Sequence, residues 1–199
     1  MKEALRKFMS KFDTFTQVEI NAIVENTKLG YFKKGTVLLR EGEVCNTCYF
    51  VLSGCVRQYQ LVDGTEKTIA FFTEEQPAVL YASYMGREPS KHYLSCVQDC
   101  LLTTGTREDE QKLHEHYPSL NYLIHNLMTH DFAKTQEHLS SLINYSPEER
   151  YQDLLKNQPG LLSRVPLHQL ASYIGVTPES FSRIRKRILV KHQSKSRLE

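Results

Sequence analysis

Four basic residues lie close together near the end of the chain. In the segment GVTPESFSRIRKRI, residues 175–188, they are Arg183, Arg185, Lys186 and Arg187. An arginine on a helix can hold guanine O6 and N7 together, and a carboxylate can accept from cytosine N4. Lysine and arginine also neutralise phosphates. The residue types in this segment therefore predict contact with double-stranded DNA.

The residues before this cluster have the pattern of a short helix followed by a tight turn. The apolar positions of this helix are Leu167, Leu170, Ala171 and Ile174. Because Ala171 is small, a second helix can cross the first one closely. Gly175 can adopt the positive φ of the turn at little cost, so we expect the first helix to end there.

A second helix follows the turn and has one apolar side. Thr177 can cap it, Pro178 suits its first position, and Glu179 suits its positive end. Its inward positions are Phe181, Ile184 and Ile188. Two helices joined by a glycine turn at this spacing indicate a helix-turn-helix.

The outward face of the second helix carries the predicted DNA contacts. We expect Glu179 and Arg183 to read base edges. The serines expected to assist them are Ser180 and Ser182. The residues expected to contact phosphates are Thr177, Arg185, Lys186, Arg187 and Lys191. The alternative is a solvated basic helix end stabilised by its dipole, but the helix, the glycine turn and the outward Glu/Arg pair together favour DNA.

The positive charge of the chain is concentrated in its last quarter. Residues 1–145 contain 15 Lys and Arg against 18 Asp and Glu, whereas residues 146–199 contain 10 against 5. This division predicts a polyanionic partner for the carboxy-terminal part alone.

The middle of the chain is predicted to be an antiparallel β-roll of the jelly-roll kind. Residues 1 to about 28 are expected to be helical, with Thr16 and Glu19 forming a capping box. From Leu29 onward, short β-branched and aromatic segments alternate with glycines. Asp63-Gly64 lies between two of these segments and predicts a two-residue hairpin turn.

A long helix is predicted to follow the roll, after a short one that begins at the acidic turn REDE. It should run from Pro118 to about Asn144. Its apolar positions, three to four residues apart with one gap, are Leu120, Ile124, Met128, Phe132, Leu139 and Leu142. Such a helix either covers the roll or pairs with a second copy of itself, and we favour pairing. Ser146-Pro147-Glu148-Glu149 then predicts the start of a further helix.

Several other classes of function are not favoured by the sequence. Five cysteines are an odd number, so they do not suit a closed disulfide framework. The spacing Cys45-x-x-Cys48 also allows a zinc or iron–sulfur site, but we favour cysteines that are buried as small apolar side chains. A metal-binding cupin needs histidines clustered on neighbouring strands, but only His92 lies among the predicted strands. The sequence also contains no nucleophile elbow and no phosphate loop. We therefore expect no metal and no enzyme activity. With no membrane span and no secretion signal visible, we expect a cytoplasmic protein.

The chain resembles the Crp/Fnr superfamily of bacterial transcription regulators over nearly its whole length. Residues 34–72, KGTVLLREGEVCNTCYFVLSGCVRQYQLVDGTEKTIAFF, resemble the family's cyclic-nucleotide-binding-type roll, and residues 167–188, LHQLASYIGVTPESFSRIRKRI, resemble its helix-turn-helix. The long helix is similar to the family's dimerisation helix. The resemblance implies a homodimer that reads a roughly palindromic duplex with half-sites about one helical turn apart, with RNA polymerase as a further partner.

The cassette that holds a cyclic phosphate in nucleotide-binding members departs from the family pattern here. Val79-Leu80 stand where the family has Gly-Glu, and Ser90-Lys91 stand where it has Arg-Ser or Arg-Thr. An apolar pair cannot accept from a ribose hydroxyl, and lysine lacks the fork of arginine. We therefore expect no ordinary cyclic AMP binding and assign no cofactor. Residues that could instead line a pocket for an unidentified small effector are Tyr81, Ser83, Tyr84, Lys91 and Tyr93.

The predicted fold class is α+β, in three parts. They are a roll with amino-terminal helices over residues 1–117, a dimerisation helix over 118–145 and a helix-turn-helix domain over 146–199. Because only KHQSKSRLE remains after the second helix, the β-hairpin wing of the family should be reduced or absent. Two alternatives remain open: a ligand-independent regulator, and a ligand-binding module whose helical domain contacts another protein.

Overall fold

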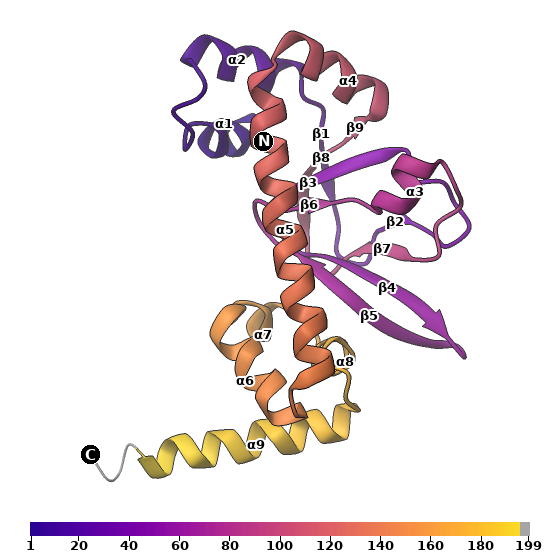
Figure 1. The fold of residues 1–199 in the computed structure, drawn as a ribbon, viewed down its shortest axis with the longest axis vertical. Coiled ribbons are helices and arrows are strands. Elements are labelled where there is room, and N and C mark those ends of the chain that lie inside the picture. The colour runs from indigo at the N-terminus through magenta and orange to yellow at the C-terminus, as the bar shows by residue number, and fades with distance from the viewer. Residues whose placement is uncertain (196–199) are drawn as a thin grey trace. The chain divides into compact units, whose positions relative to one another are not determined.

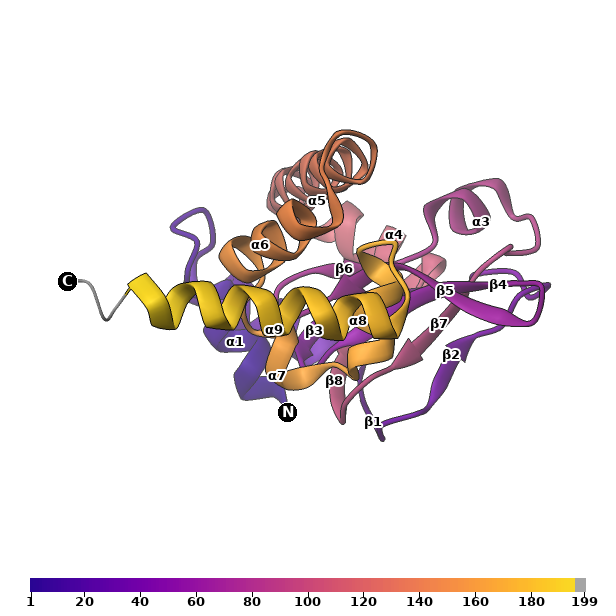
Figure 2. The same ribbon diagram turned by 90° about the horizontal axis from the view of Figure 1, so that it is seen from below.

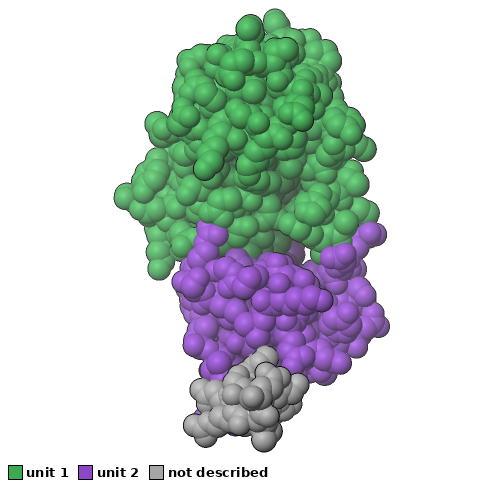
Figure 3. Space-filling view, turned by 90° about the vertical axis from the view of Figure 1, so that its left-hand side faces the viewer, with its two compact units in different colours: residues 1–60, 70–134 green, residues 61–69, 135–199 purple. Residues whose placement is uncertain are grey.

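The computed structural model describes residues 1–195, with side chains described for residues 1–190. The chain divides into two compact units (Figure 3). The first contains residues 1–60 and 70–134, and the second contains residues 61–69 and 135–199. The boundary between the two units thus falls within the long helix.

The strands of the described residues form two antiparallel sheets, as the sequence predicts (Figure 1). One sheet has the order β1 (Leu29–Phe32), β8 (Cys100–Thr103), β3 (Thr47–Ser53) and β6 (Pro77–Ala78), and β9 (Gly105–Thr106) also pairs with β3. The other has the order β2 (Val37–Leu39), β7 (Tyr93–Cys96), β4 (Val56–Val62) and β5 (Thr65–Phe72). Apolar residues from both sheets, among them Val51, Val56, Leu94 and Leu102, are fully buried in one core. These alternating apolar positions explain why the segments fold as a roll.

The predicted hairpin turn between β4 and β5 is present. Asp63 and Gly64 have φ of 51° and 72°. Positive φ at both central residues defines a type I′ turn, whose twist matches that of the strands, and Asp-Gly is one of the pairs that adopt it readily. The turn belongs to residues 61–69, the tip of the hairpin, which we call the hairpin tip.

The first unit also contains helices. They are α1 (Lys2–Met9), α2 (Gln17–Asn26), α3 (Tyr81–Gly86), α4 (Arg107–His116) and the first part of α5 (Ser119–Asn144). The capping box of Thr16 and Glu19 is confirmed, since the Thr16 Oγ1 accepts from the Glu19 amide at 3.2 Å. Leu120, predicted on the pairing face of α5, is only 7% exposed and packs among residues of α1 and α2. That prediction is wrong because the amino-terminal helices cover the first turn of α5.

The second unit is helical apart from the hairpin tip. Its helices after α5 are α6 (Pro147–Asn157), α7 (Leu161–Arg164), α8 (Leu167–Tyr173) and α9 (Pro178–Lys195). The sequence did not predict the short α7. Leu167 is 39% exposed at the first residue of α8, whereas Tyr173 is buried. Leu167 is therefore not part of the apolar face predicted for this helix, because it precedes the turns of α8 that are packed.

The helix after the turn extends further than predicted. It continues to Lys195, and no strand follows it within residues 1–195. None of the helices in the described part of the chain combines the length and apolar character needed to cross a membrane.

Candidate nucleic-acid interface

The turn between α8 and α9 has the predicted geometry. Gly175 has a φ of 69°, and a Cβ added there would lie 3.2 Å from the Arg150 guanidinium. The Val176 amide donates to the Ala171 carbonyl at 2.9 Å, and the Ser180 amide donates to the Thr177 Oγ1 at 3.2 Å. Glycine is thus favoured both by the backbone conformation and by the space, and Thr177 is the predicted cap.

The inner side of α9 is packed against α6 and α8 (Figure 2). Phe181, Ile184 and Ile188 are all buried, as predicted. The Phe181 ring meets the Tyr151 ring edge to face, with centroids 5.3 Å apart. This packing fixes the rotation of α9 about its axis, and hence which residues face outward.

The opposite side of α9 presents the predicted reading residues. Glu179, Arg183 and Lys186 are exposed, and at 3.6 residues per turn they fall on one stripe. The Arg183 guanidinium donates to the Ser180 Oγ at 3.2 Å. Hydrogen bonds from its own amide and from Thr177 lower the pKa of Glu179, so this carboxylate is charged at neutral pH. Ser182 is also exposed beside the stripe.

The predicted phosphate contacts differ in how free their side chains are. Arg185 is exposed, like Lys186 of the stripe. The hydroxyl of Thr177 already accepts the capping hydrogen bond, and Arg187 forms an ion pair with Glu148 at 3.0 Å. The Lys191 side chain lies outside the described residues. Thr177 and Arg187 are exposed as well but are already bonded within the protein, whereas Arg185 and Lys186 are exposed with no such bond among the described residues.

A hollow of about 1350 Å³ opens beside the first turns of α9. Its walls are the hairpin tip at residues 65–67, the start of α6, α8 and residues 175–187. The predicted reading residues Glu179, Ser180 and Arg183 line it. The sequence did not predict that His168, Ser172 and the hairpin tip line this hollow. A local sequence pattern does not show which helix a hairpin will contact.

The residues predicted to line an effector pocket in the first unit are mostly engaged with the protein itself. The Ser83 Oγ accepts from the Cys45 amide at 2.9 Å and donates to the Glu88 carbonyl at 2.6 Å. The Tyr84 hydroxyl donates to Glu110 of α4 at 2.5 Å, and burial together with this carboxylate raises the pKa of Tyr84.

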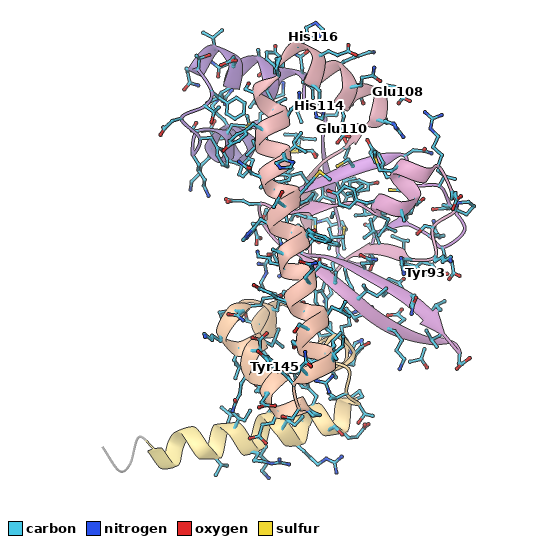
Figure 4. All side chains as sticks on the ribbon, viewed as in Figure 1. Tyr93, Glu108, Glu110, His114, His116 and Tyr145 are labelled. Atoms are coloured by element: carbon cyan, nitrogen blue, oxygen red, sulfur yellow. The ribbon has the colours of Figure 1, made fainter. Side chains whose placement is uncertain are left out.

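The other three predicted pocket residues lie in different surroundings. Tyr81 is half-buried, and burial raises its pKa. The Tyr93 ring stacks on the Tyr59 ring, with ring centroids 4.9 Å apart. Figure 4 labels Tyr93, and it also labels Glu110, the partner of Tyr84. Lys91 is exposed. Of the five residues, Ser83 and Tyr84 are thus bonded within the first unit, and Lys91 is open to solvent.

Comparison with known proteins identifies the fold. Residues 29–117 match the family model of the cyclic nucleotide-binding domain. A transcriptional regulator of the Crp/Fnr family from Eubacterium rectale is 18% identical with a TM-score of 0.65, over 89% of this chain and 85% of that chain. The chain has the Crp/Fnr fold. The resemblance in fold and the predicted fold class are thereby confirmed.

Two further solved structures share the Crp/Fnr fold with this chain. FixK2 from Bradyrhizobium japonicum is 17% identical with a TM-score of 0.71, over 83% of this chain and 86% of that chain. The c-di-GMP-responsive global regulator CLP from Xanthomonas campestris is 19% identical with a TM-score of 0.71, over 89% of this chain and 93% of that chain. No curated protein sequence matches the chain.

The positions that depart from the nucleotide-binding pattern have clear structural roles in this Crp/Fnr fold. Val79 and Leu80 are buried in the core of the roll. The buried Ser90 Oγ donates to the His92 carbonyl and accepts from its amide. These side chains stabilise the roll and its loop.

All five cysteines are free thiols. Cys45, Cys55, Cys96 and Cys100 are buried, and Cys48 is half-buried. Burial raises the pKa of Cys48 well above that of a free thiol, as expected for a thiol packed as an apolar side chain. In the part of the chain that the structure describes, no three potential metal ligands lie together.

His138 of α5 is stacked on Tyr173 of α8, with ring centroids 4.1 Å apart. Burial lowers the pKa of His138, and Asp153 opposes this effect. Well above pH 6.5 the imidazole is neutral in both the folded and the unfolded chain. As the pH falls through 6.5, the unfolded chain takes up a proton that the folded chain binds less well, so stability falls.

His138→Phe should therefore weaken the pH dependence of stability. Phenylalanine keeps a ring against Tyr173 but cannot titrate. The loss in free energy of unfolding between about pH 7.5 and 5.5, measured by urea denaturation, should be smaller in this variant than in the wild type. His125→Gln, an exposed change on the same helix, should leave the dependence as it is. Equal pH profiles for the wild type and His138→Phe would show that His138 does not contribute.

Proposed function

We propose that this protein is a sequence-specific DNA-binding transcription regulator that acts as a homodimer and, through bound DNA, on RNA polymerase. The observation that carries the proposal is the α8–Gly175–α9 motif with Glu179 and Arg183 outward on a packed helix. A helix presented in this way fits the major groove, and these two side chains match guanine and cytosine edges. The roles follow the sequence prediction: base reading by Glu179, Ser180, Ser182 and Arg183, and phosphate contact from exposed Arg185 and Lys186.

An exposed apolar stripe on α5 supports the homodimer. Phe132, Leu139 and Ile143 are 62%, 57% and 72% exposed, and Met128 lies on the same side of the helix. Large apolar side chains aligned on one face of a single chain favour pairing with an identical stripe. The predicted Ile124 and Leu142 are half-buried at the edge of this stripe, and Ile143 takes a place that the sequence pattern did not assign.

We further propose that cyclic AMP is not an ordinary ligand. The burial of Val79 and Leu80 and the internal hydrogen bonds of Ser83 and Tyr84 support this view. The regulator is then either independent of a ligand or responsive to another small effector. We propose no role in catalysis.

Selection of bound sequences from random duplex DNA tests the proposed function, with and without added cell metabolites. We expect a roughly palindromic consensus whose half-sites are about one helical turn apart. Affinity for that duplex should fall steeply with added salt, because phosphate contacts release counterions. A flat salt response with no enriched sequence would favour the alternative, in which the helical unit contacts another protein.

Arg183→Ala and Arg185→Ala should separate base reading from phosphate contact. Arg183→Ala should weaken binding to the selected duplex by about 1–3 kcal/mol and relax selection at one base pair. Arg185→Ala should weaken all duplexes similarly and reduce the salt slope by about one. Fluorescence anisotropy on matched and single-mismatch duplexes measures both effects. A uniform loss on every duplex for Arg183→Ala would assign it to phosphate.

A further inference from the structure

The hairpin tip is fastened to α8 by a pair of hydrogen bonds. The Thr68 amide donates to the Ser172 Oγ at 2.8 Å, and this hydroxyl donates to the Glu66 carbonyl at 3.4 Å. Thr68 is 8% exposed, although it lies close to a surface turn. One serine side chain thus bonds to the backbone at two points of the tip and holds it against the helix that precedes the reading helix.

The same tip forms a wall of the hollow that the reading residues line. Thr65, Glu66 and Lys67 border it from one side, with Glu179 and Arg183 among its other lining residues. A helix inserted in a major groove about 12 Å wide has a sugar–phosphate backbone on each side of it. The tip stands beside the first turns of α9, where one of these backbones would have to pass.

The charges of the tip do not suit contact with DNA. Asp63 and Glu66 are exposed acids in the segment 61–69, and Lys67 is its one base. The tip therefore carries a net negative charge, and a phosphate backbone in the same place would be repelled. A tip that itself contacted DNA would be expected to be basic.

We propose that the hairpin tip is a latch that keeps DNA from the reading face of α9, and that Ser172 holds the latch closed. Binding of DNA then requires the Thr68 and Glu66 hydrogen bonds to Ser172 to break. Because the tip joins β4 to β5, a change in these strands is a direct way to release it. The inference rests on the proposed DNA-binding function.

Ser172→Ala tests the latch in the full chain. Alanine removes both hydrogen bonds and leaves the Thr68 amide without this acceptor, so the closed state loses stability. We expect affinity for the selected duplex to rise about three- to tenfold, the effect of losing a hydrogen bond that holds the closed state. The matched control is Ser163→Ala, which removes a hydroxyl bonded to the Gly160 carbonyl at 3.1 Å, away from the hollow, and should not change affinity.

Amide hydrogen exchange gives a second readout that needs no variant. The Thr68 amide should be protected in the free protein and should exchange faster when the selected duplex is added. Equal affinity of Ser172→Ala and the wild type, or unchanged exchange at Thr68, would overturn the latch while leaving the DNA-binding function intact. Lower affinity of Ser172→Ala would also overturn it and assign Ser172 to DNA contact. If no duplex is bound by the wild type or by Ser172→Ala, the proposed function fails, and the latch with it.

Discussion

Replacing Phe132 by glutamate should make the chain monomeric and lower its affinity for the palindromic duplex by about a hundredfold or more. Phe132 is 62% exposed, so the substitution should cost the single chain little stability. In a homodimer the same position would bury two carboxylates against each other in an apolar seam, which strongly opposes association. Two linked half-site contacts bind about 10²–10⁴ times better than one, and this advantage is lost in the monomer.

Sedimentation velocity and anisotropy on the same samples measure these two effects of Phe132→Glu. The matched control is Asn126→Glu, an exposed position on another side of α5, which should leave both the mass and the affinity unchanged. A wild-type chain that is itself monomeric at micromolar concentration would contradict the predicted pairing, whatever the variant does.

Phe181→Ala should have the largest effect on stability in the second unit. The side chain is fully buried and forms an edge-to-face contact with Tyr151. Removing a buried phenylalanine leaves a cavity and typically costs about 3–5 kcal/mol. Because this packing sets the rotation of α9, the variant should lose DNA binding together with stability.

Urea denaturation followed by circular dichroism measures the loss of stability in Phe181→Ala. Leu189→Ala on the same helix is the control, since Leu189 is 53% exposed and its removal should change stability by less than about 0.5 kcal/mol. A change below about 1 kcal/mol for Phe181→Ala would mean that α9 is not held as the structure describes.

Local patterns predicted much of the secondary structure and the outward face of α9. Apolar residues at positions 181, 184 and 188 identified the buried side of α9 and so its outward residues. Capping residues such as Thr16 and Ser146, and the Asp63-Gly64 turn, identified element ends. These features depend on interactions within a few residues, which is why the sequence alone reveals them.

Only the tertiary structure decided which apolar side chains are exposed and which polar side chains are hydrogen-bonded to distant segments. Leu120 and Phe132 follow the same periodicity on α5, but α1 and α2 cover one and leave the other exposed. Likewise, no local pattern showed that Ser172 would hold the backbone of residues 66 and 68, more than a hundred positions away. Periodicity defines the face of a helix, but what covers that face depends on contacts between distant segments, which only the folded chain brings together.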